Sequence, residues 1–162
     1  MQVTFIYKDD NYFPSRENVT TALCNAVCRM LSLPQSIEIE FADTGDSIYG
    51  ETYVDPRFKN RIRLKSTIEP ADLINVLTHE LIHLNQIFTG RLQAFPHGLF
   101  VWDGKRYICE TRALDYDQQQ KLPWEIDVVN KQHYRQKWRP FTFFVCQYII
   151  AIDFYSHCPS PA

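Results

Sequence analysis

Residues 77–86 read LTHELIHLNQ and lie inside a longer apolar run. Over residues 70–88, Leu, Ile and Val recur at helical spacing and cover most of the circumference, which predicts a helix buried on nearly every side. The proline at the start of this segment suits a first turn, and Gly90 is a typical signal for the end. The two histidines and the glutamate of the quoted stretch are therefore polar groups on a core helix.

His79 and His83 are four residues apart, so their imidazoles project from the same helix face, with about 5 to 6 Å between Cβ atoms. Glu80 is offset by about 100° and can reach a water held by a metal ion without binding the ion itself. This is the HExxH spacing of zinc hydrolases, in which the ion lowers the pKa of water toward about 7 and the glutamate takes the proton. Hydrogen bonding within the core is the alternative, but each unpaired buried polar group costs about 1 to 3 kcal/mol, and one ion would satisfy all three.

A catalytic zinc needs a third protein ligand and an open position for water. The metzincin extension requires glycine at position 86 and histidine at position 89, where this chain has glutamine and threonine. The remaining candidates are later in the chain: Glu110, Glu125 with Asp127, and His133. We favour Glu125, because it falls in the first turn of a helix predicted to begin at Pro123, and a rigid element can aim it at the ion. Asp127 suits a hydrogen bond to a zinc-bound imidazole, or the helix N-terminus.

Composition and charge are those of an ordinary soluble domain. The 162 residues are 45% hydrophobic and 22% charged, and this length suits one domain spanning residues 1–162. A net charge of −2 does not supply the positive field that phosphate backbones attract, so we expect no nucleic-acid partner. No apolar run reaches the roughly 18 to 20 residues that span a bilayer, and the first residues lack the features of a signal peptide. We therefore expect a cytoplasmic protein without a membrane partner.

The five cysteines are an odd number, and in a reducing compartment we expect free thiols. Cys24 and Cys28 lie one turn apart in a segment whose apolar residues follow a helical period. Free cysteine behaves as a small buried hydrophobe, so this pair indicates core packing in preference to metal binding.

Four segments before the central helix have the pattern of strands. They are residues 2–7, 36–42, 47–54 and 60–65. A helix that begins at Pro14 and ends before Pro34 separates the first two, and a Thr-Gly-Asp turn at residues 44–46 joins the second to the third. Hairpin turns of this kind predict a small, mostly antiparallel sheet packed on the central helix.

A hairpin and helices are predicted after the central helix. Residues 97–109 form the hairpin, because an Asp-Gly pair between two aromatic-rich arms is a strong type I′ turn signal. One helix is predicted from Pro123 to about Trp138, and the apolar residues 141–155 form a last packed helix. The fold class is therefore predicted to be α+β.

HELIHLNQ, then a hairpin with WDGKRY, then LPWEID on a following helix together resemble the small single-domain HExxH metallopeptidase-like proteins often encoded by bacteriophages. The resemblance covers roughly residues 70–135. It implies a minimal zincin-like fold, a site completed by Glu125 in the gluzincin manner, and a location in the host cytoplasm if the chain is phage-encoded. It also implies that residues 47–54 are an edge strand along which an extended peptide lies.

The sequence thus predicts a zinc-dependent metallopeptidase with a peptide or protein substrate. His79, His83 and Glu125 hold one Zn²⁺, and Glu80 is the general base. The alternative is a non-catalytic module for binding, or a virion-associated structural module, that the same ion stabilises. Hydrolysis also needs a donor for the developing oxyanion, for which the candidates are Tyr107, His133 and Tyr134.

Overall fold

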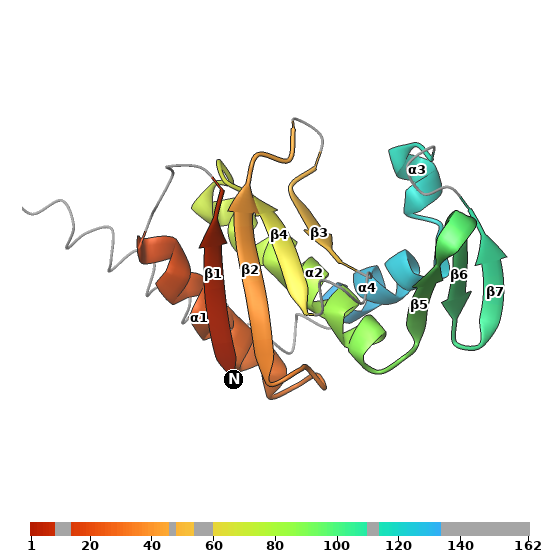
Figure 1. Cartoon of the computed structure of the whole chain (residues 1–162), viewed down its shortest axis with the longest axis horizontal. Coiled ribbons are helices and arrows are strands. Elements are labelled where there is room, and N and C mark those ends of the chain that lie inside the picture. The colour runs from red at the N-terminus through yellow and green to blue at the C-terminus, as the bar shows by residue number, and fades with distance from the viewer. Residues whose placement is uncertain (9–13, 46–47, 54–59, 110–113, 134–162) are drawn as a thin grey trace, which may run out of the picture.

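The computed structural model describes residues 1–8, 14–45, 48–53, 60–109 and 114–133. Its larger sheet contains β1 (Gln2–Tyr7), β2 (Ser36–Ala42), β3 (Gly50–Thr52) and β4 (Arg61–Lys65) (Figure 1). Its smaller sheet contains β5 (Leu92–Phe95), β6 (Leu99–Trp102) and β7 (Lys105–Ile108), with a 3-10 turn at Pro96–Gly98. The helices are α1 (Pro14–Cys28), α2 (Pro70–Phe88), α3 (Tyr116–Gln119) and α4 (Pro123–His133). The described part of the chain is α+β, as predicted.

The larger sheet has the order β1-β2-β4-β3 and is mixed. β1 pairs parallel with β2, β2 pairs parallel with β4, and β3 pairs antiparallel with β4. The prediction of a mostly antiparallel sheet is therefore wrong. The predicted hairpin between the second and third strands is also wrong, because β4 lies between β2 and β3. Parallel strands need crossovers of about a dozen residues or more, and α1 and residues 43–60 supply them.

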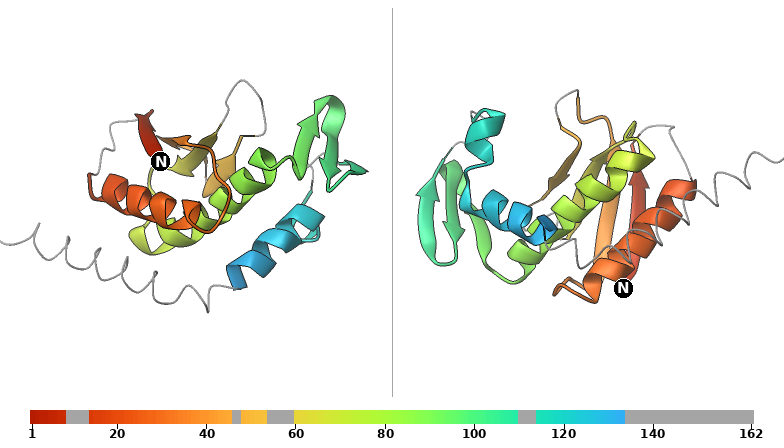
Figure 2. Two further views of the ribbon diagram at one scale, coloured as in Figure 1. Left: turned by 90° about the horizontal axis from the view of Figure 1, so that it is seen from below. Right: turned by 180° about the vertical axis from the view of Figure 1, so that it is seen from behind.

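The alternation of apolar and charged residues correctly predicts which face of the sheet is buried. The inward residues, all at most 1% exposed, are Ile37, Ile39, Phe41, Ile62 and Leu64. α1 and α2 cover this one face of the sheet (Figure 2). On the opposite face, Arg61 contacts Glu38 and Glu40, and Arg63 contacts Glu40 as well. These cross-strand pairs of opposite charge favour the observed register of β2 and β4.

α2 runs through the middle of the molecule with the bounds that the sequence predicts. Pro70 occupies its first turn, and Gly90, with φ +75°, follows its last residue. The apolar side chains that face the sheet and α1, each at most 1% exposed, are Leu73, Leu77, Leu81 and Leu84. Five polar side chains on the same helix are buried with them, namely Thr78, Glu80, His83, Asn85 and Gln86. The interior around α2 is therefore not purely apolar.

The smaller sheet contains the predicted hairpin together with a strand, β5, that the sequence did not predict. Asp103 and Gly104 have φ values of +45° and +81°, as a type I′ turn requires. Trp102 from this sheet packs in a second apolar cluster with Leu92 and with Trp124 from α4. α4 is thereby held near the end of α2. The rest of the helix predicted to Trp138 and the predicted helix at 141–155 lie outside the described residues.

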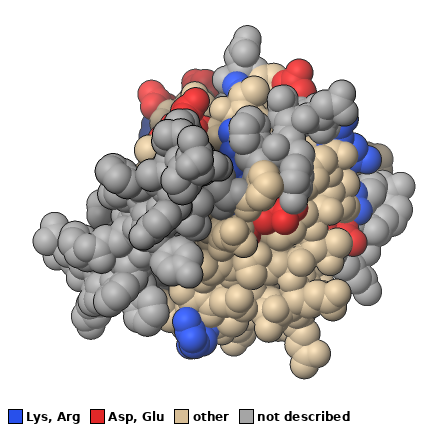
Figure 3. All heavy atoms as spheres, turned by 90° about the vertical axis from the view of Figure 1, so that its left-hand side faces the viewer, with Lys and Arg blue, Asp and Glu red and all other residues tan. Residues whose placement is uncertain are grey.

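Charged side chains are unevenly distributed over the surface. Seen from the side that carries β1 and α1, few of them interrupt the described surface, and most lie toward its margins (Figure 3). Within the described ranges, no helix combines the length and the apolar character that a membrane crossing requires.

Leu77→Ala is expected to lower the free energy of unfolding by about 2 to 5 kcal/mol, because the truncation leaves a cavity where α2 meets the sheet. Ile108→Ala is the control, because this side chain is 85% exposed and its loss is expected to change the free energy by less than about 0.5 kcal/mol. Urea unfolding followed by circular dichroism measures both variants. Equal losses would contradict the placement of Leu77 in the core.

Candidate metal centre

Three side chains from two helices converge at one point. His79 and His83 project from α2, and Glu125 projects from the first turn of α4. The Nε2 atoms of the two imidazoles are 3.0 Å apart, and each lies 3.2 Å from a different oxygen of the Glu125 carboxylate. A tetrahedral zinc site with bonds of about 2.0 to 2.2 Å holds its ligand atoms roughly 3.4 Å apart. Shifts of a few tenths of an ångström would therefore place these three groups around one ion.

Among the candidates for the third ligand, the structure describes the side chains of Glu125 and Asp127, and these two have different positions. The structure brings Glu125 to both histidines, as the preferred assignment requires. Asp127 reaches His83 through Gln86, whose amide nitrogen lies 2.9 Å from an Asp127 oxygen and whose amide oxygen lies 2.9 Å from the imidazole. Glu110 and the side chain of His133 lie outside the described residues. The role of Glu125 as a ligand stays a prediction, now with a geometry that suits it.

Glu80 lies beside these three groups and faces the edge strand β3. Its side chain is buried, and the Thr52 hydroxyl donates a hydrogen bond to carboxylate oxygen Oε2 at 2.7 Å. Burial raises the pKa of Glu80 above its ordinary value, and this effect outweighs the opposing influence of the two histidines and of the hydrogen bond from Thr52. A carboxylate with a raised pKa is a stronger proton acceptor, which is the property that a general base needs.

β3 approaches Glu80 closely because Gly50 has no side chain. A Cβ at Gly50 would lie 2.6 Å from Cγ1 of Val76 and 3.0 Å from Cγ of Glu80. Gly50 and Thr52 are two residues apart in one strand, so they share the face that is turned toward this glutamate. A strand was predicted over this segment, but neither residue was singled out, because their role depends on where β3 lies relative to α2.

Charge links His83 and Glu125. Burial lowers the pKa of His83, but the hydrogen bond and the charge of Glu125 outweigh it and raise the pKa to about 9. Burial raises the pKa of Glu125, whereas hydrogen bonds from the two imidazoles lower it, to about 2. Without a metal, these opposite pKa shifts favour a protonated His83 paired with an ionised Glu125. A metal ion needs the neutral imidazole, so metal binding displaces this proton.

Other residues considered from the sequence have different surroundings. The ring of Tyr107 packs edge-on against Trp124, with ring centroids 5.9 Å apart, while Tyr134 lies outside the described residues. The assignment of an oxyanion donor stays a prediction. Cys24 is buried in the core as predicted, and burial raises the pKa of its thiol to about 12, so it stays protonated.

In chelator-treated protein, the pairing of His83 with Glu125 is expected to contribute most to stability between about pH 4.5 and pH 6.5. Glu125 has a lowered pKa, so its contribution to stability is present above its ordinary value of 4.5 and is lost as the pH falls toward 2. His83 has a raised pKa, so its contribution is present below 6.5 and is lost as the pH rises through 9. Melting temperature against pH in EDTA measures this profile. His83→Gln is the control and should show a shallower decline above pH 6.5; identical declines would contradict the pairing.

The donor set defines what this centre can do. Two imidazoles and one carboxylate are ligands that zinc accepts readily. A buried glutamate beside them is placed to accept a proton from a water in the same space. No protein-family model, curated protein or solved structure matches the chain, so its function is inferred from these residues and their contacts.

Proposed function

We propose that this chain is a zinc-dependent metallopeptidase with a zincin-like fold of the gluzincin type. His79, His83 and Glu125 hold one Zn²⁺, and Glu80 is the general base. The observation that carries the proposal is the convergence of these three ligand groups from α2 and α4 next to a buried glutamate. The HExxH spacing and the LPWE segment, which resemble the small phage-encoded metallopeptidase-like proteins, support the same assignment.

Each residue has a defined task in peptide-bond hydrolysis. When bound, zinc would lower the pKa of a water toward about 7 and polarise the scissile carbonyl. Glu80 takes a proton from that water as the new carbon–oxygen bond forms, and returns it to the amine nitrogen as the carbon–nitrogen bond breaks. Thr52 holds one carboxylate oxygen of Glu80 and so fixes the direction of the other.

The substrate we propose is a peptide segment in an extended conformation. β3 is at the edge of the four-stranded sheet. Its residue Thr52 donates a hydrogen bond to Glu80, and the absence of a side chain at Gly50 leaves room for the same glutamate. A peptide that adds to this edge as a further strand would form main-chain hydrogen bonds with β3. Its backbone would then pass beside the general base and the three ligand groups.

The alternative is a zinc-stabilised module without turnover, either for binding or as part of a virion. The bridge that Glu125 makes between α2 and α4 favours it, because an ion at that point would tie the two helices together. Both candidates require zinc, and they differ in whether Glu80 does chemistry.

Glu80→Gln is expected to reduce cleavage of a quenched fluorescent peptide library by at least about 100-fold, because the amide cannot accept the proton. Zinc content is expected to stay at the wild-type level. Glu69→Gln, at an exposed position before α2, is the control and should cleave normally. An unchanged rate in Glu80→Gln would exclude Glu80 as the base. Zinc-loaded wild type without any cleavage would favour the non-catalytic module.

Elemental analysis of purified protein is expected to find about one zinc per chain. Glu125→Ala is expected to weaken zinc affinity by more than the 10- to 100-fold that loss of an outer hydrogen-bonding partner typically costs. Glu69→Ala is the matched control and should retain zinc. Wild-type affinity in Glu125→Ala would remove this residue from the ligand set, and no zinc in folded wild type would contradict the metal centre itself.

A further inference from the structure

Gln86 is the most deeply buried polar side chain near the metal centre. It is 0% exposed and lies on α2, three residues after His83 and on the same face. Burying an amide without hydrogen-bond partners is costly, so the bonds that Gln86 makes define its place. Its side chain makes hydrogen bonds to three residues, one on α2 and two on α4.

The partners of Gln86 fix which way its amide points. The amide nitrogen donates to the backbone oxygen of Trp124 at 3.0 Å and to Asp127 at 2.9 Å. Both partners are acceptors, so the reversed amide would set oxygen against oxygen twice. The amide oxygen must therefore face His83, where it lies 2.9 Å from Nδ1.

This orientation determines the tautomer of the imidazole. An amide oxygen can only accept, so Nδ1 of His83 must carry the hydrogen. In the neutral ring, Nε2 then keeps its lone pair, and Nε2 is the atom that lies beside His79 and Glu125. The hydrogen bond also fixes the plane of the ring.

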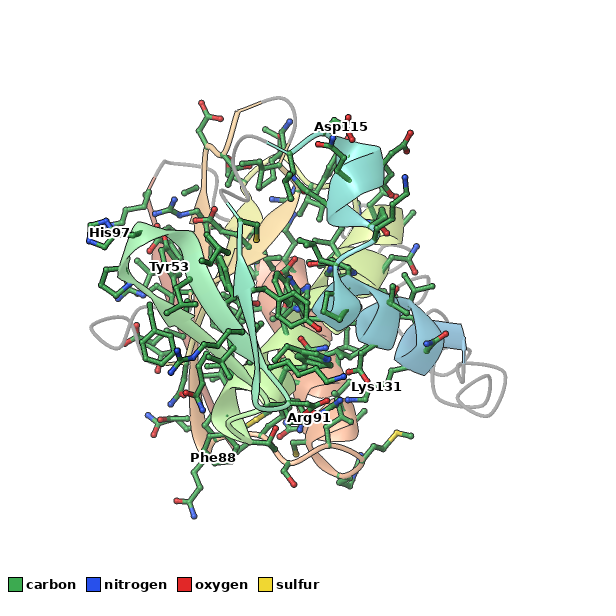
Figure 4. The ribbon with its side chains drawn as sticks, turned by 90° about the vertical axis from the view of Figure 1, so that its right-hand side faces the viewer. Tyr53, Phe88, Arg91, His97, Asp115 and Lys131 are labelled. Atoms are coloured by element: carbon green, nitrogen blue, oxygen red, sulfur yellow. The ribbon has the colours of Figure 1, made fainter. Side chains whose placement is uncertain are left out.

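The other end of the network is anchored by charge. Asp127 accepts hydrogen bonds from Arg91 at 3.1 Å and forms an ion pair with Lys131 at 3.0 Å. Lys131 projects from α4, and Arg91 lies close to it (Figure 4). Two cations on one carboxylate hold Asp127 as an acceptor, which in turn keeps the Gln86 amide from reversing.

We propose that Gln86 is a positioning residue that orients the histidine ligand on α2 and holds in place the segment of α4 that carries Glu125. It sets the ring of His83 on α2, and it binds α4 at Trp124, the residue before Glu125, and at Asp127, two residues after Glu125. One side chain thereby fixes the separation between a histidine ligand and the carboxylate ligand. This inference rests on the proposed zinc site.

The test compares Gln86→Leu with Asn85→Leu. Asn85 is the adjacent buried amide on α2, and it donates to the backbone oxygen of Ser32, away from the metal centre. Both substitutions remove a buried hydrogen-bonding amide, so both are expected to lower the melting temperature. Only Gln86→Leu is expected to weaken zinc affinity, by about 10- to 100-fold, measured by competition with a chromogenic chelator. The visible absorption of the Co²⁺-loaded protein is expected to change in this variant alone.

The outcomes separate this inference from the proposed function. If Gln86→Leu folds and keeps wild-type zinc affinity and an unchanged Co²⁺ spectrum, the inference is overturned and the metal centre stands. Equal losses of zinc affinity in Gln86→Leu and Asn85→Leu also overturn the inference. Absence of zinc from the wild type overturns both. If Gln86→Leu does not fold, Gln86→Met keeps the length of the side chain, and Asp127→Ala removes one acceptor of the Gln86 amide at a partly exposed position. Each is expected to weaken zinc binding, and wild-type affinity in either one contradicts the positioning role.

Discussion

The burial of polar groups on α2 is the constraint on which the rest of the structure depends. Glu80, His83 and Gln86 are 6%, 9% and 0% exposed, and an unpaired group at such a position costs free energy comparable to a lost hydrogen bond. α2 cannot supply all the partners itself. β3 provides the hydroxyl for the glutamate, and α4 provides the acceptors for the glutamine and a carboxylate for the histidine. The positions of β3 and α4 against α2 follow from these needs as much as from apolar packing.

Features set by neighbouring residues could be predicted from the sequence. The bounds of α2, the type I′ turn at Asp103 and Gly104, and the start of α4 at Pro123 all depend on local conformational preferences. The inward faces of β2 and β4 were equally accessible, because side chains alternate whatever the neighbouring strand is. The order of the strands in the sheet could not be predicted in this way. Alternation is identical in parallel and antiparallel sheets, so nothing in residues 36–42 shows that β4 and not β3 lies next to them.

In the candidate site, too, some residues could be predicted from local sequence and others depend on tertiary contacts. The spacing of His79, Glu80 and His83 is local, and Glu125 could be selected because a helix start makes a rigid support. Gln86 has a weaker signal: its position three residues after His83 places it on the same helix face and is compatible with a contact. The contact of Thr52 with Glu80 has no signal in the sequence, since it depends on how β3 lies against α2.

Arg91 connects the smaller sheet to α4, although this sheet contributes no ligand group. The guanidinium lies 4.4 Å from the ring centre of Trp102, and it also binds Asp103 at the hairpin turn and Asp127 on α4. Through Arg91, the hairpin therefore helps to hold in place the helix that carries Glu125. If the chain holds a metal as proposed, substitutions in the hairpin would be tolerated only while α4 stays in place. Metal retention would then constrain the evolution of a sheet that contributes none of the three candidate ligand groups.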